Sequence, residues 1–157
     1  MLQKPTNLRF FLGLRFFFGV LGLAYSLSAN ALDFRSIAPA KAILYDAPSL
    51  ESDKLYIISG AYPVEIIVNL NNWLKVRDAS GSLSWVESKN LSSKRTVIAI
   101  TKTEIKSTED PTAALVATVE KDVVLDLLEN RQNGWVKVKH QSGVTGFVQV
   151  GSVWGIN

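Results

Sequence analysis

"NNWLKVRDASGSLSWVESKNL" occupies residues 71–91, and "QNGWVKVKHQSGVTGFVQVGSV" occupies residues 132–153. Each contains, in succession, Trp, an aliphatic residue, Lys, Val and a further basic residue. A glycine-containing turn, an aromatic residue and Val follow in both. Trp135 follows Trp73 by 62 positions (135 − 73 = 62), and the same offset relates Phe147 to Trp85. A phrase repeated in register predicts two copies of one structural unit.

The repeated phrase divides its side chains between two faces, because successive side chains of a β-strand point to opposite sides. The aliphatic face is expected to form the core, and its members are Leu74, Val76 and Val86 in the first copy and Val136, Val138 and Val148 in the second. The aromatic residues fall on the other face, beside Lys and Arg. Such a face is a candidate ligand platform, but cross-strand aromatic pairs also stabilise small sheets by themselves. Both interpretations stay open at this point.

Short apolar runs bounded by turn residues continue from Leu32 to the end of the chain, which is typical of an all-β protein. The predicted strands are 42–45, 55–59, 64–69, 73–77 and 83–86 in the first half, and 96–100, 103–106, 115–119, 123–128, 135–139 and 146–150 in the second. The two units are expected at 33–93 and 96–157, joined at "SSKR" (92–95). This joint is short and has neither Pro nor Gly, so the two units are expected to dock rigidly.

The first 31 residues have the composition of a secretory signal peptide. Lys4 and Arg9 precede the apolar stretch 16–27, and Ala29-Asn30-Ala31 supplies small residues at a cleavage position, so we expect cleavage after Ala31. The mature protein is then expected to be soluble and periplasmic or secreted. The alternative is an uncleaved inner-membrane anchor, which would place Arg15 in the hydrocarbon at a cost of roughly 3 kcal/mol.

The charge and the cysteine content exclude several classes of function. Residues 1–31 hold three of the 17 basic residues and no acidic residue, which leaves 14 basic residues against 14 acidic ones in the remainder. The remainder therefore lacks the basic field that nucleic-acid binding requires. There is no Cys and only one His, His140, so disulfides, a zinc site and a Ser-His-Asp arrangement are not expected. We expect no enzyme activity, no metal and no cofactor.

The two phrases resemble the signature of the bacterial SH3-like (SH3b-type) domain family, in which a Trp-containing Lys-Val phrase precedes a glycine turn and an aromatic-Val pair. Together with the closing "VWGIN", the chain is similar to the tandem SH3-like proteins that proteobacteria export. The resemblance implies an all-β fold with two tandem small SH3-like barrels after an N-terminal signal peptide, each barrel having five to six strands. It also implies a non-catalytic binding role, since several relatives bind peptidoglycan.

Two functions are compatible with these observations. The first is an exported binding module that recognises a peptide or peptidoglycan ligand in the cell envelope. The second is a periplasmic protein–protein interaction adaptor with no wall ligand. The expected partner is thus a cell-wall peptide or an envelope protein, and not nucleic acid. The candidate contact residues are Tyr45, Tyr62, Trp73 and Trp85, with Arg77 for a carboxylate, in the first unit, and Trp135 and Phe147 in the second.

Overall fold

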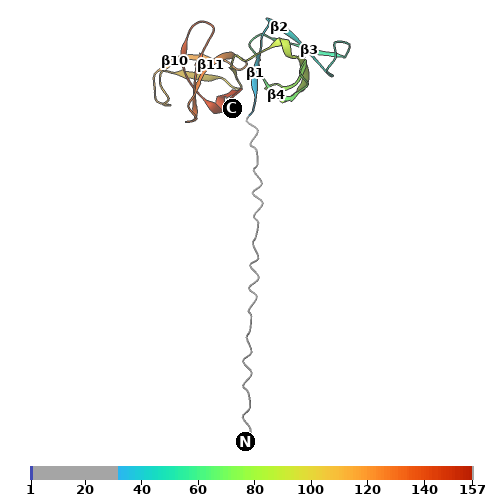
Figure 1. Cartoon of the computed structure of the whole chain (residues 1–157). Coiled ribbons are helices and arrows are strands. Elements are labelled where there is room, and N and C mark those ends of the chain that lie inside the picture. The colour runs from blue at the N-terminus through green and yellow to red at the C-terminus, as the bar shows by residue number, and fades with distance from the viewer. Residues whose placement is uncertain (2–31, 157) are drawn as a thin grey trace.

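The computed structural model describes residue 1 and residues 32–156 (Figure 1). The predicted signal peptide and its cleavage site lie outside these residues, apart from Met1. The regular elements of the described part are strands and two short 3₁₀ turns, so the all-β prediction is confirmed. Within residues 32–156 no helix has the length and apolar character that crossing a membrane requires.

The strands form two separate antiparallel sheets of seven strands each. The first sheet, with the 3₁₀ turn η1 (Ser88–Asn90), is called unit 1 here and consists of β1 (Phe34–Ile37), β2 (Lys41–Tyr45), β3 (Lys54–Ser59), β4 (Pro63–Asn69), β5 (Trp73–Arg77), β6 (Leu83–Glu87) and β7 (Leu91–Ser92). The second, with η2 (Val150–Ser152), is called unit 2 and consists of β8 (Thr96–Ala99), β9 (Thr103–Lys106), β10 (Leu115–Val119), β11 (Val124–Asn130), β12 (Trp135–Lys139), β13 (Thr145–Gln149) and β14 (Val153–Trp154).

The two sheets have the same topology. Their strand orders are β3-β2-β6-β5-β4-β1-β7 and β10-β9-β13-β12-β11-β8-β14, which are identical after a shift of seven strands. All eleven predicted strands are present, with ends that differ by at most two residues. Each sheet has one or two strands more than the resemblance implied, and a strand of two residues lies at one edge of each. The two-residue strands β7 and β14 pair with β1 and β8.

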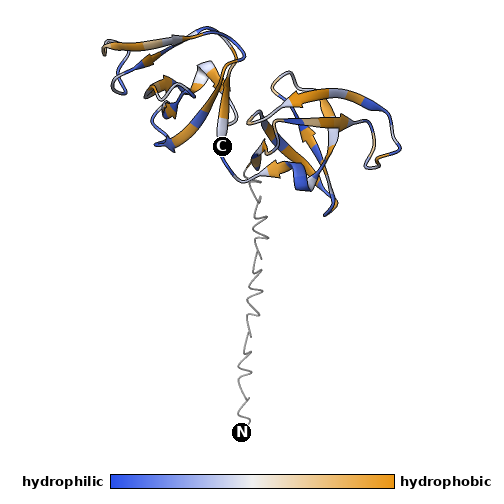
Figure 2. Cartoon of the chain, turned by 90° about the horizontal axis from the view of Figure 1, so that it is seen from above, coloured by the Kyte–Doolittle hydropathy of each residue, from blue (hydrophilic) through white to orange (hydrophobic). Residues whose placement is uncertain are grey.

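Each unit has its own hydrophobic core, as the alternation in the repeated phrase predicts. Leu74 is 8% exposed, and Val76, Val86, Val136, Val138 and Val148 are each at most 1% exposed. Figure 2 shows the same alternation of apolar and polar segments along the strands of both units. The hairpins that carry these residues turn at Gly81 and Gly143, whose φ angles of 90° and 93° favour glycine.

The two units contact each other directly, as the short joint predicts. The Thr96 hydroxyl on β8 donates a hydrogen bond of 2.7 Å to the Ala61 carbonyl of unit 1. The rings of Phe34 on β1 and Trp154 on β14 meet edge to face with centroids 5.0 Å apart. Arg95 lies over the Phe34 ring and donates to the Gly155 carbonyl at 2.8 Å. The C-terminal end of unit 2 therefore lies beside β1 of unit 1 (Figure 1).

Candidate functional site

Trp73 and Trp135 begin the equivalent strands β5 and β12, and each side chain is half-buried. The antiparallel register places Trp73 opposite Glu87 and Trp135 opposite Gln149. Each tryptophan also lines a surface groove between the first long loop of its unit and the end of its hairpin. The repeated phrase thus contributes the same aromatic wall to both grooves.

The groove beside Trp73, called groove 1 here, has a volume of about 470 Å³. One side is the loop Pro48–Glu51, and the other is formed by Glu87, Ser88 and Lys89. The Ser52 hydroxyl donates to the carbonyl oxygens of Ala47 and Ser49 at 2.9 Å and 2.7 Å, which holds the loop in a compact turn. Trp73 therefore borders an open groove and is not covered by the loop.

Tyr45 is the residue beneath Trp73. Its ring meets the Trp73 ring edge to face at a centroid distance of 5.3 Å, and the residue is only 5% exposed. An edge-to-face pair of this kind contributes about 0.5–1.5 kcal/mol beyond area burial. Tyr45 therefore orients the indole, while Trp73 itself presents the exposed surface.

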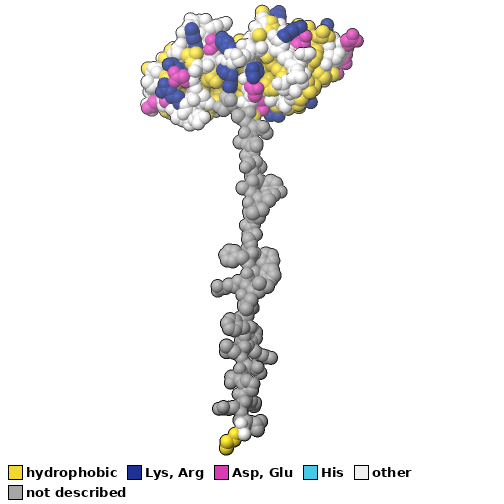
Figure 3. All heavy atoms as spheres, viewed as in Figure 1, with side chains coloured by type: hydrophobic (Ala, Val, Ile, Leu, Met, Phe, Trp, Pro, Cys, Tyr) yellow, Lys and Arg dark blue, Asp and Glu magenta, His cyan; other side chains and the backbone are white. Residues whose placement is uncertain are grey.

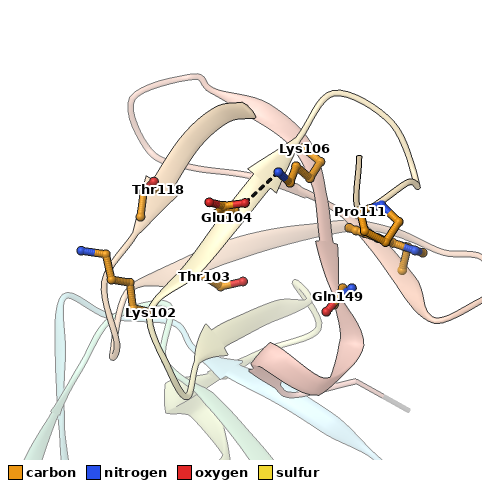
Figure 4. Close-up of a pocket in the computed structure, with 8 residues that line it drawn as sticks. Lys102, Thr103, Glu104, Lys106, Pro111, Thr118 and Gln149 are labelled. Carbon is orange, nitrogen blue, oxygen red and sulfur yellow. Dashed lines mark ion pairs between the residues drawn. The ribbon is translucent and has the colours of Figure 1, made fainter. Parts of the chain in front are cut away.

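The groove beside Trp135, called groove 2 here, has a volume of about 490 Å³. Its lining comes from β9, from the loop that contains Pro111, from Thr118 on β10 and from Gln149 on β13 (Figure 4). On β9, the Lys106 ammonium and the Glu104 carboxylate form an ion pair of 2.7 Å across the groove wall. The Lys106 side chain is 16% exposed, so its charge is held close to the sheet.

Trp85 and Phe147 line neither groove. The register places them opposite Lys75 and Lys137. The Lys75 ammonium lies 5.9 Å from the Trp85 ring centroid, and Lys137 and Arg131 lie 6.0 Å and 5.9 Å from that of Phe147. Basic side chains thus pack over these rings, so the aromatic residues of one outer face have two different environments.

Arg77 and Tyr62 lie near the contact between the two units. Arg77 is four residues, or roughly 13 Å, along β5 from Trp73, and its guanidinium contacts Glu65 at 3.3 Å. Tyr62 borders a cavity of about 230 Å³ with Ile98 and Lys121 of unit 2. Burial raises the pKa of the Tyr62 hydroxyl, although the hydrogen bond that it accepts from the Ala79 amide opposes this effect. The structure therefore brings Tyr45 and Trp73 together and places Arg77 and Tyr62 elsewhere.

Comparison with known proteins identifies the family. The family model described as "Bacterial SH3 domain" matches residues 38–93 and 108–155, which is more than half of the chain. The chain belongs to the bacterial SH3 domain family. Its two units are therefore two tandem bacterial SH3 units.

Solved structures with some likeness to this tandem SH3 chain include NlpC2 from Trichomonas vaginalis, with 16% identity, a TM-score of 0.37 and coverage of 81% of this chain and 49% of that one. NlpC1 from the same organism has 17% identity, a TM-score of 0.37 and coverage of 82% and 47%. An NlpC/P60 family protein from Bacillus cereus has 12% identity, a TM-score of 0.36 and coverage of 78% and 56%. The chain spans about half the length of these proteins. No curated protein matches it.

His140 has a structural role in its SH3 unit. Its Nδ1 lies 2.8 Å from the Ser142 hydroxyl oxygen and accepts a hydrogen bond of 3.2 Å from the Ser142 amide. The equivalent residue of the first SH3 unit, Asp78, accepts from the Ser80 amide at 2.8 Å in the same way. Asp78 and His140 thus close the hairpin turns that follow β5 and β12. Among residues 32–156, no cluster of His, Asp and Glu is placed to hold a metal ion.

Sequence reasoning missed the polar residues of both grooves, notably Glu51, Glu87, Lys106 and Gln149. A signal for two of them was present, because Glu87 and Gln149 are related by the repeat offset and share the outer face with the tryptophans. Glu51 and Lys106 could not be found in this way, since they approach the tryptophans only through the fold of the loop and the pairing of β9 with β13.

Proposed function

We propose that the protein is an exported, non-catalytic SH3-like module that binds a peptide or peptidoglycan ligand in the cell envelope. The observation that carries this proposal is the presence of two grooves, each with a half-buried tryptophan at the same position of the repeat. Bacterial SH3 domains are typically extracellular or periplasmic, which supports a ligand outside the cytoplasm. The predicted signal peptide is part of the same proposal.

The chemistry of the grooves suits such a ligand. An indole face binds apolar groups and the C–H faces of sugars, while its N–H can donate a hydrogen bond. Charged and hydroxyl side chains surround each indole and can fix the orientation of peptide groups. Both grooves are open to the surface, so a segment of a polymer can lie in them without its ends being enclosed.

A non-catalytic role agrees with the family and with the local geometry. Bacterial SH3 domains are typically non-catalytic. The one His of the chain hydrogen-bonds within its own turn, to Ser142, in the manner of a residue that closes a hairpin turn. On the face seen in Figure 3, Lys, Arg, Asp and Glu lie intermixed, which argues against an extended basic surface for nucleic acid there.

Co-sedimentation with purified insoluble peptidoglycan tests the proposal. The full chain should sediment with the polymer at low salt, and the double variant Trp73→Ala/Trp135→Ala should lose at least about tenfold in bound fraction. Lys139→Ala serves as the matched control, because it removes an exposed charge outside both grooves. If the full chain remains in the supernatant, wall binding is wrong.

A protein–protein adaptor is the second candidate, and one observation favours it. Strand β3 is at the edge of the first sheet, and Leu55 and Ile57 on it are 46% and 65% exposed. An apolar edge strand is a surface on which another chain can pair. A photocrosslinking amino acid at position 57 should then capture one reproducible envelope protein in cells. Recovery of no such protein would count against the adaptor.

A further inference from the structure

The two grooves differ in charge although each contains the tryptophan of the repeat and the residue opposite it. Groove 1 has two carboxylates, on Glu51 and Glu87, and one ammonium, on Lys89. Groove 2 has two ammonium groups, on Lys102 and Lys106, and one carboxylate, on Glu104. Among the lining residues, the first groove thus has an excess negative charge and the second an excess positive charge. Glu120, which is outside the lining of groove 2, pairs with Lys102 there.

In groove 1, the excess charge lies close to the indole of Trp73. Glu87 is directly opposite Trp73 in the strand pairing, and its carboxylate contacts the Lys89 ammonium at 2.7 Å. Lys89 is 71% exposed and balances only one of the two carboxylates. Glu51 is exposed on the loop across the groove. A cation entering here would meet two carboxylates beside an indole, a ring whose face attracts cations.

In groove 2, the Lys106–Glu104 pair leaves Lys102 as the excess charge, and Figure 4 shows these three side chains projecting from the β9 region. Lys102 contacts Glu120 at 2.6 Å, but the two side chains are 64% and 68% exposed. Exposed ion pairs of this kind contribute little to stability. A ligand carboxylate can therefore replace Glu120 at Lys102.

One pair of equivalent residues makes much of this difference. Glu87 and Gln149 are related by the repeat, and each is opposite the tryptophan of its groove. They have nearly the same shape, but only Glu87 is charged. The two units therefore differ, at the position opposite the tryptophan, by the replacement of a charged Glu with a neutral Gln.

We propose that groove 1 binds an ammonium-bearing part, and groove 2 a carboxylate-bearing part, of one peptide ligand. The proposal rests on the envelope-binding function and names the ligand chemistry of its two grooves. Opposite charges in the two grooves favour a ligand that has both kinds of group, because either groove alone would discriminate against one of them.

Two small probes separate the charges. Nα-acetyl-lysine amide has an ammonium and no carboxylate, and N-acetyl-alanine has a carboxylate and no ammonium. The indole N–H signals of the four tryptophans in a ¹H–¹⁵N spectrum of the full chain report each site separately. At low ionic strength, the lysine probe should shift the Trp73 signal and the alanine probe the Trp135 signal. Trp154 borders neither groove and is the internal reference.

The charge swap is the decisive test. Glu87→Gln should weaken the response of Trp73 to the lysine probe at least about fivefold, and Gln149→Glu should create a response of Trp135 to the same probe while weakening its response to the alanine probe. Asp33→Asn, which removes an acid outside both grooves, should change neither response. Because two variants at two sites are used, a folding defect in one of them leaves the other as a test.

The outcomes distinguish this inference from the broader function. If the full chain sediments with peptidoglycan but both probes shift both indoles equally, or shift neither, the charge inference is wrong and the wall-binding function stands. If the probes divide between the grooves as described and the chain does not sediment, the charge inference stands and the wall ligand is wrong. Unchanged responses in both swap variants would also overturn the inference.

Discussion

At the scale of single residues, Trp73 has two roles: its ring packs edge to face with Tyr45, and its side chain lines groove 1. Trp85, the other tryptophan of the same phrase, is opposite Lys75 and outside the grooves. Substitution of each tryptophan therefore tests a different role of the repeated phrase.

Trp73→Ala is expected to reduce both stability and binding. The loss of the Tyr45 contact and of half-buried area should cost about 2 kcal/mol of the free energy of unfolding, and sedimentation with peptidoglycan should weaken. Trp73→Phe should retain most of the stability.

Trp85→Leu should lower the melting temperature without a specific loss of sedimentation. If it abolishes sedimentation while the fold persists, Trp85 contacts the ligand. Thermal melts and sedimentation of the same preparations provide both measurements.

Asp78 provides a prediction on pH dependence. Burial raises its pKa, but hydrogen bonds from Ser80, Tyr56 and Ser82 outweigh that effect and hold the pKa below the usual value for an aspartate. A carboxylate with a lowered pKa stabilises the folded state at neutral pH, and this contribution disappears as the pH falls below about 4. Asp78→Asn should therefore melt a few degrees below the parent at pH 7, and the difference should shrink toward pH 2. An equal difference at every pH would contradict the assignment. Asp46→Asn is the control for an exposed aspartate.

The sequence predicted the buried residues of the repeated phrase better than the exposed ones. Alternation alone identified Leu74, Val76 and Val86 and their counterparts, because burial on one face of a sheet follows directly from side-chain period. The surroundings of Trp85 and Arg77 depend on which strand lies alongside, and Glu65 next to Arg77 comes from β4. Pairing between strands is set by the whole fold and cannot be read from a single strand.

At the scale of elements, the structure adds β1, β7 and β14 to the predicted strands. Strands of two residues have no periodicity to detect, and β7 and β14 exist because β1 and β8 offer them a free edge. The 3₁₀ turn before each of them directs the chain back to that edge. The eleven predicted strands each have several residues of alternating or β-branched character. Strand β1, although it is as long as β8, was not predicted.

The packing of β13 on β9 makes a sharp prediction about glycine. A Cβ at Gly146 would lie 2.5 Å from both the Ile105 Cγ2 atom and the Lys106 carbonyl oxygen. Gly146→Ala should therefore destabilise the protein by about 1–3 kcal/mol through overpacking. Gly151→Ala, where nothing lies within 4 Å, should change the stability by no more than about 0.5 kcal/mol. Chemical denaturation of the two variants measures the difference, and equal stabilities would contradict this account of β13.

At the scale of the whole molecule, the contacts between the SH3 units join them into one body. Thr96 is 1% exposed and donates to a carbonyl of the other unit. Phe34 and Trp154 add an aromatic contact across the same boundary. The short joint between the units predicted that they dock. The residues that form the contact could not be identified from the sequence, because the partners lie far apart in it.

Weakening this boundary should separate the unfolding of the two units. The parent is expected to unfold in one calorimetric transition, and the double variant Thr96→Val/Trp154→Ala should unfold in two, or in one that is clearly broadened. The hydrogen bond alone should account for about 1 kcal/mol, since its loss leaves the partly buried Ala61 carbonyl without this donor. Thr145→Val alters an exposed threonine and should leave the transition unchanged. A single sharp transition in the double variant would show that the units are not coupled through these residues.

The contact of Thr96 with Ala61 has a consequence for avidity. When two weak sites belong to one rigid body, occupation of the first places the ligand near the second at a fixed effective concentration, and a polymer whose binding groups match the spacing gains about 10²–10⁴ in affinity with no new contact. A polymer with a different repeat gains nothing. The contact between the two SH3 units would then select ligands by the spacing of their binding groups, although the residues of this contact do not touch the ligand.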